Sequence, residues 1–145
     1  YASTRASFDM LPPEKQAMVE KLRAIHDFQR SRDMVAPDLV ETRIRKMLPP
    51  VVRPLVRVNP GTGKRSLYIA SHADYIESMT REESRPLLDE LLDWCTRPEC
   101  VYTHQWSVGD LVMWDNRCVQ HHALHDYAGQ RRHVRRITVK GDQPR

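Results

Sequence analysis

Residues 114–121 read Trp114-Asp115-Asn116-Arg117-Cys118-Val119-Gln120-His121, and two arginines follow at fixed distances. Arg132 lies eleven residues after His121, and Arg136 lies four residues further on. A turn predicted at 126–129 would fold residues 132–139 back as a strand beside His121. On that strand Arg132 and Arg136 would share one face, about 13 Å apart at about 3.3 Å per residue. The pattern predicts a metal-binding histidine opposite arginines that grip carboxylates with planar forks, or else an ordinary basic surface.

The histidines of this sequence could belong to either of two kinds of metal site. A zinc protease would place His121, His122 and His125 on a helix, but its general-base glutamate is absent and the cysteines form no C-x-x-C pair. A non-haem iron site uses two histidines and one carboxylate, often with two of them in an H-x-D string. The string His72-Ala73-Asp74 is present. Such a short string arises easily by chance.

The first half of the chain predicts helices and one hairpin. Met18, Leu22 and Ile25 recur at helical spacing after Pro12-Pro13, which predicts a helix there. A second short helix is expected over 41–48, with a loop over 29–38 between the two. The β-rich runs 53–58 and 65–70 flank an Asn-Pro-Gly turn and predict a β-hairpin.

The second half predicts one helix followed by strands. Thr80 and Glu83 match a capping box, and leucines at helical spacing continue to Cys95, although Pro86 moves the expected helix start toward Ser84. Strand-like runs follow at 100–106, 111–114 and 132–139. The sequence therefore predicts an α+β domain, mainly β, with residues 1–50 mostly helical and residues 51–145 β-rich around one inserted helix.

Composition and charge exclude several classes of protein. The 145 residues are 40% hydrophobic and 29% charged, enough for a packed core, and contain no apolar run long enough to cross a membrane. Three cysteines form no disulfide framework, so a cytoplasmic location is expected.

The formal charge is +4, and residues 117–145 alone carry seven basic and two acidic residues. This basic segment leaves open a non-catalytic module that binds anions or nucleic acid. Residues 128–145 contain none of the aromatic residues that stack on single strands, which argues against nucleic acid.

The long motif at 114–121, continued by Asp126-Tyr127, Gln130-Arg131-Arg132, Arg136 and Gly141-Asp142, resembles the C-terminal motif of the taurine / chlorophenoxyacetate dioxygenase (TauD/TfdA) family. The resemblance extends through the hairpin and covers most of the chain. Ser71-His72-Ala73, residues 96–104 and residues 109–114 are closer to the chlorophenoxyacetate branch. The resemblance to this family implies a double-stranded β-helix (jelly roll) with flanking helices. It also implies an activity that depends on Fe(II) and 2-oxoglutarate.

The resemblance also implies roles for individual residues. His121 matches the distal iron ligand, Arg132 the arginine that binds the far carboxylate of 2-oxoglutarate, and Arg136 the arginine that binds the acidic group of the substrate. His72 falls in a segment that lies near the substrate in the family, but His72-Ala73-Asp74 is not at the position of the family's H-x-D ligands. The chain begins at Tyr1, just after the stretch that carries those ligands, so we expect this sequence to be the C-terminal portion of one catalytic domain, inactive by itself.

We therefore expect the complete protein to hydroxylate a small organic acid resembling an aryloxy carboxylate, using O2, with an alkyl sulfonate, taurine or sulfate ester as the alternative substrate. We further expect a homo-oligomer that binds neither nucleic acid nor membrane.

Overall fold

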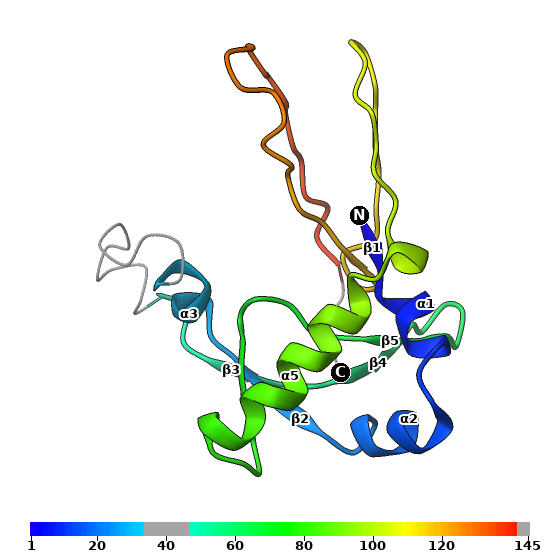
Figure 1. Ribbon diagram of the computed structural model, residues 1–145, viewed down its shortest axis with the longest axis vertical. Coiled ribbons are helices and arrows are strands. Elements are labelled where there is room, and N and C mark those ends of the chain that lie inside the picture. The colour runs from blue at the N-terminus through cyan, green and yellow to red at the C-terminus, as the bar shows by residue number, and fades with distance from the viewer. Residues whose placement is uncertain (34–46, 142–145) are drawn as a thin grey trace.

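The order of helices and strands is mixed in the computed structural model, which describes residues 1–33 and 47–141 (Figure 1). Helix α5 is the longest element, and the strands are short. The elements in chain order are β1 (Ala2–Ser3), α1 (Thr4–Asp9), α2 (Pro13–Val19), β2 (Arg23–His26), α3 (Phe28–Asp33), β3 (Val51–Pro54), β4 (Val56–Val58), β5 (Arg65–Leu67), β6 (Ala73–Ile76), α5 (Arg81–Cys95), the 3₁₀ turn η2 (Pro98–Cys100) and β7 (Val119–Gln120).

The described strands form three small antiparallel sheets. In the largest, β2 lies between β3 and β6, so that Ile25 is opposite both Val52 and Tyr75. Strands β4 and β5 form the predicted hairpin, whose turn closes where the amide of Gly63 donates to the carbonyl of Asn59. Gly63 has a φ of +66°, a conformation that favours glycine. The third sheet pairs β1 with β7, which brings the start of the chain next to residues 119–120.

Helix α5 covers one side of this body and supplies much of its core (Figure 1). Its predicted capping box is confirmed, since Thr80 Oγ1 accepts from the Glu83 amide and the Glu83 carboxylate accepts from the Thr80 amide. The helix begins at Arg81 rather than near Ser84, and it contains Pro86 on its exposed side. Its inward face recurs at helical spacing and consists of Ser84, Leu88, Leu91 and Cys95.

The N-terminal region departs from the expected helices. Helix α2 ends at Val19, and residues 23–26 form strand β2 because β3 and β6 offer hydrogen-bonding partners on both sides. Part of the predicted loop at 29–38 is helical, in α3. Most of the helix expected over 41–48 lies outside the described residues. No helix in the described part of the chain is long and apolar enough to cross a membrane.

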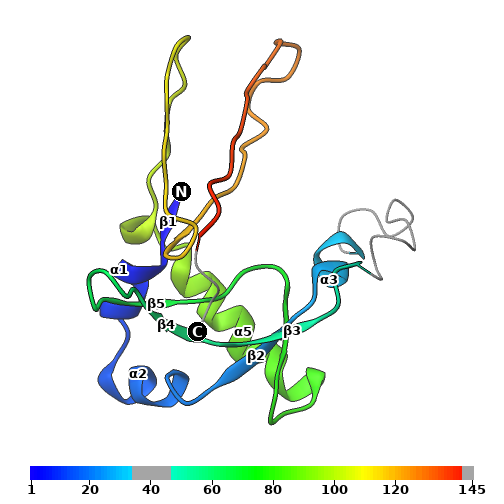
Figure 2. The same ribbon diagram turned by 180° about the vertical axis from the view of Figure 1, so that it is seen from behind.

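Two extended arms, residues 102–118 and residues 121–141, project from the same side of the body (Figures 1 and 2). The strands expected at 100–106, 111–114 and 132–139 are not formed there; Val101 alone makes an isolated bridge, to Ala2. Apolar side chains on both arms are exposed, among them Leu111 and Ile137. A strand requires a neighbouring backbone for its N–H and C=O groups. Among the described residues the arms find such partners only at their base, where Tyr102 exchanges two hydrogen bonds with Tyr1 and the Cys118 carbonyl accepts from the Thr4 amide.

His26 is a polar side chain buried in the largest sheet. It is 6% exposed, and both ring nitrogens lack a hydrogen-bond partner among the described residues. Burial, followed by the nearby His72 and Arg53, lowers the pKa of His26 to about 4. The imidazole is therefore neutral in the folded protein at neutral pH.

We expect His26 to make the fold sensitive to acid. Its folded pKa lies below the ordinary value of 6.5, so the unfolded chain binds more protons between pH 6.5 and pH 4. The stability is fully present above pH 6.5 and falls as pH drops toward 4, by about 3 kcal/mol from this group alone. Urea unfolding of wild type and His26→Phe across this range measures the difference.

The matched control is His122→Phe, at an exposed histidine. The control should keep the wild-type dependence on pH, whereas His26→Phe should flatten it. Equal acid sensitivity in wild type and His26→Phe would contradict the assignment.

Candidate functional site

Strand β7 positions His121 through its pairing with the start of the chain. Ala2 is opposite Gln120 and Ser3 is opposite Val119. The amide of Thr4 donates to the carbonyl of Cys118 at 3.0 Å, which extends this pairing by one hydrogen bond. The Gln120 side chain donates to the carbonyl of Ile69 and so connects β7 to the segment after the hairpin. His121 is the first residue of the second arm and follows this fixed strand directly.

An aromatic and cationic group surrounds the imidazole of His121. The ring centre of Trp114 is 5.0 Å from that of His121, and Tyr1 lies on Trp114 at 5.2 Å. The guanidinium Nη1 of Arg136 is 3.5 Å from His121 Nε2, at the limit of a hydrogen bond. Partial burial, then Arg136 and the amino terminus, lowers the pKa of His121. A neutral imidazole is the form that binds a metal ion.

Arg132 and Arg136 have different environments in the structure. Arg136 contacts His121, whereas the Arg132 guanidinium lies 5.3 Å from the ring centre of Tyr127. Because residues 132–139 are not in a strand, the alternation of side chains that predicted a shared face does not apply to them. The structure thus brings together His121 and Arg136, whereas Arg132 contacts Tyr127 on the same arm instead.

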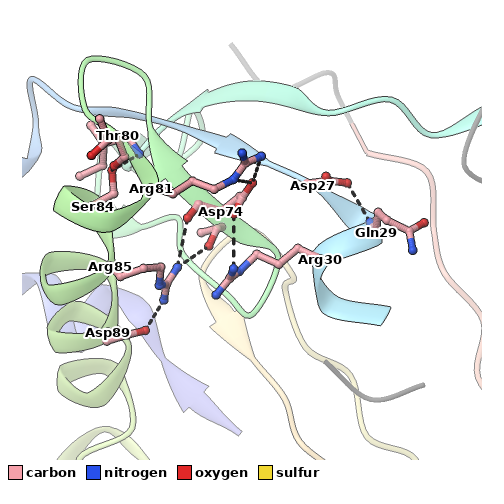
Figure 3. A network of polar contacts seen from close by, with 11 residues as sticks. Asp27, Gln29, Arg30, Asp74, Thr80, Arg81, Ser84, Arg85 and Asp89 are labelled. Carbon is pink, nitrogen blue, oxygen red and sulfur yellow. Dashed lines mark hydrogen bonds and ion pairs between the residues drawn. The ribbon is translucent and has the colours of Figure 1, made fainter. Parts of the chain in front are cut away.

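The string His72-Ala73-Asp74 is built into the body of the protein rather than into this group. The carboxylate of Asp74 accepts from Arg81 Nε at 2.9 Å and Nη2 at 2.8 Å, and from Arg30 Nη1 at 3.4 Å (Figure 3). Arg85 donates to the carbonyls of Ala73 and Asp74. These contacts join α3, β6 and α5, so the Asp74 carboxylate is already paired and is a poor candidate for a metal ligand.

His72 lies against His26, with ring centres 5.6 Å apart, and burial lowers its pKa. Its carbonyl accepts from the amide of Asp27 at 2.8 Å. No contact joins His72 to His121 among the described residues. Its assignment to the substrate pocket stays a prediction.

Two aromatic residues of the His121 group were not predicted to belong to it. Trp114 precedes His121 by seven residues, a spacing that does not indicate a contact between the two rings. Tyr1 reaches Trp114 through the β1–β7 pairing, which no local pattern indicates.

The described residues do not by themselves complete a metal site. No group of three or more His, Cys, Asp or Glu side chains within residues 1–33 and 47–141 is placed to hold a metal ion. A facial triad for Fe(II) requires two histidines and one carboxylate. Among the candidate ligands, His121 has the neutral imidazole that such a site needs, and it can supply one of the three.

Comparison with solved structures identifies the fold. A crystal structure of AAD-2 in complex with Mn(II) and N-oxalylglycine aligns with a TM-score of 0.75 and 41% identity, covering 81% of this chain and 46% of that chain. A taurine dioxygenase from Burkholderia xenovorans aligns with a TM-score of 0.66 and 30% identity, covering 81% of this chain and 37% of that chain.

Comparison with curated proteins gives the same grouping. The alpha-ketoglutarate-dependent 2,4-dichlorophenoxyacetate dioxygenase of Cupriavidus pinatubonensis is 42% identical over 98% of this chain and 50% of its own length. An alkylsulfatase of Acinetobacter baylyi is 35% identical over 98% of this chain and 47% of its own length. The chain thus spans about half the length of these relatives. The sequence model of the taurine catabolism dioxygenase TauD, TfdA family matches residues 1–138, and the chain belongs to this family.

Proposed function

We propose that the complete protein is an Fe(II)- and 2-oxoglutarate-dependent dioxygenase that hydroxylates a small organic acid. The observation that carries the proposal is the pairing of His121 with Arg136, whose nitrogens are 3.5 Å apart. A neutral imidazole can bind the metal, and an arginine beside it can hold an anionic group close to that metal.

We propose that the other two metal ligands lie outside the described residues, because the chain spans half the length of its relatives and no described group of three His, Cys, Asp or Glu side chains could hold a metal ion. We propose that the complete protein then forms the double-stranded β-helix, in which the two arms would find neighbouring strands. When bound, Fe(II) and 2-oxoglutarate would supply the oxidising power for the reaction with O2. The protein holds both acids in place and excludes water. Arg132 would bind the far carboxylate of 2-oxoglutarate, and we propose a homo-oligomeric assembly.

The first substrate class we propose is an aryloxy carboxylate. The likeness to dichlorophenoxyacetate dioxygenases at 42% and 41% identity supports it. A sulfate ester or sulfonate is the second candidate, supported by the likeness to an alkylsulfatase and to a sulfate ester dioxygenase of Pseudomonas putida. Both classes place a compact anion where an arginine can form two parallel hydrogen bonds.

We expect His121, and not His122 or His125, to bind the metal in the complete protein. His121 follows β7 and its ring lies against that of Trp114, whereas the His122 side chain makes no hydrogen bond or ring contact with a described residue. His121→Ala should abolish both the Fe(II)-dependent visible absorption of the 2-oxoglutarate complex and oxygen-dependent succinate formation. His122→Ala and His125→Ala are the matched controls and should keep the absorption. Loss with His122→Ala and retention with His121→Ala would refute the assignment.

We expect Arg136 to select acids over neutral analogues. A charge-assisted hydrogen bond contributes on the order of 1.5–3 kcal/mol, or roughly 10- to 150-fold in binding. Wild type should therefore prefer an aryloxyacetic acid over its amide by that factor in kcat/KM. Arg136→Ala should lose the preference, and Arg136→Lys should recover only part of it because an ammonium lacks the planar fork.

Arg135→Ala is the control for Arg136, since it removes the same charge from the neighbouring exposed position. It should leave the preference for the acid intact. Equal use of acid and amide by wild type would exclude Arg136 as the substrate arginine.

A further inference from the structure

A second concentration of positive charge lies outside the His121 group, in a cavity of about 210 Å³. The turn between β4 and β5 lies beside α1 in both views (Figures 1 and 2). Residues of these elements and of the segment 115–118 line the cavity. The cavity contains none of the residues assigned to iron, 2-oxoglutarate or substrate. Its charged lining residues are Arg5, Arg57, Lys64, Arg65, Arg117 and Asp115.

Hydrogen bonds between these segments fix the walls of the cavity. The amide of Thr4 donates to the carbonyl of Cys118 at 3.0 Å, and the Ser66 hydroxyl donates to the carbonyl of Arg117 at 3.3 Å. The Cys118 amide donates to the Asp115 carbonyl, which closes the turn at 115–118. Helix α1, strand β5 and this turn are thereby held together without using the cationic side-chain ends.

The carboxylates near the cavity do not balance its cations. Asp115 forms a two-pronged pair with Arg117, with contacts of 2.7–3.0 Å, and Glu20 pairs with Arg65 at 3.0 Å. With both carboxylates counted, five cations leave a net charge of +3. Like charges that converge on one concave surface repel one another even when they are exposed, and a bound anion relieves that repulsion.

Three of the five cations have no carboxylate partner in the described part of the chain. Arg5, Arg57 and Lys64 make no ion pair with a described residue; the Arg57 guanidinium lies 4.9 Å from the ring centre of Tyr68. Arg57 also helps lower the pKa of Asp115, after the larger effect of Arg117. The positive field therefore extends across the cavity from both walls.

We propose that this cavity is a binding site for a small oxyanion with two or more negative charges, of the phosphate or pyrophosphate class. Its volume is below the roughly 300–1,000 Å³ typical of sites for drug-sized ligands, so a compact ion fits it better than a large cofactor. A planar guanidinium group can donate two parallel hydrogen bonds to two oxygens of one phosphate, and the lysine ammonium adds a compact positive charge. The site is independent of the dioxygenase proposal, because it uses none of the same side chains.

The test is isothermal titration calorimetry of the purified complete protein with inorganic pyrophosphate at low salt. Arg5→Gln and Lys64→Gln should each weaken binding about 5- to 10-fold, as expected for charge-assisted contacts that are partly exposed. Both side chains are exposed, so neither change removes a core contact. Arg23→Gln is the matched control, since Arg23 carries the same charge, pairs with Glu77 and does not line the cavity. It should bind pyrophosphate as wild type does.

Three results would overturn the proposal. The first is that wild type shows no heat of binding when pyrophosphate reaches a 10-fold molar excess over protein at millimolar concentration. The second is that Arg23→Gln and Arg5→Gln weaken pyrophosphate binding equally. The third is that a single-stranded oligonucleotide binds more tightly than pyrophosphate through the same residues. The last result would assign the site to nucleic acid phosphates instead. Unchanged circular dichroism of each variant shows that a loss of binding is not a loss of folding.

Discussion

The antiparallel pairing of β1 with β7 holds the candidate site around His121 in place. It consists of two residue pairs, extended by the hydrogen bond from Thr4 to Cys118. These contacts join residues more than 110 positions apart in the chain, so they close a long loop whose entropy other contacts must offset. The helix α1 that follows β1 packs on β5, and this packing anchors the pair to the core. The positions of His121, Trp114 and the cationic cavity depend on this connection.

The two arms show the opposite situation: their sequence is typical of β-strands, but in the described part of the chain they are not paired in a sheet. Residues 132–139 alternate in a way typical of strands, and their apolar side chains are nevertheless exposed, Ile137 at 91% and Val139 at 87%. Propensity for extended backbone is satisfied in both arms, but a sheet also requires a second backbone at about 4.8 Å. Exposed apolar side chains on an extended segment are typical of a surface that binds another segment. This supports the proposal that the arms belong to a larger β-structure in the complete protein.

Local patterns predicted local structure well. The capping box of Thr80 and Glu83, the helix to Cys95 and the hairpin around Gly63 each depend on residues within a few positions of one another, and each is confirmed. Strand β2 was wrongly predicted as helix, because Leu22 and Ile25 fit a helical stripe as well as they fit a strand. What decides between them is pairing with β3 and β6, some 30 and 50 residues away, which periodicity cannot indicate.

The same limit applies to the candidate sites. The long motif ending at His121 predicted the family, which the comparisons confirm, because many residues at fixed spacing carry that signal. The buried His26 and its contact with His72 were not predicted, since an isolated histidine in a sequence carries no information on its burial. Along the sequence the excess of cations lies in residues 117–145, yet the charged residues that line the cavity come from α1, the hairpin and one residue of that segment, Arg117. Charge acts through space rather than along the chain, and at a Debye length of about 8 Å only neighbours in the fold contribute to a site. A count along the sequence therefore finds a basic protein, and the fold determines where an anion can bind.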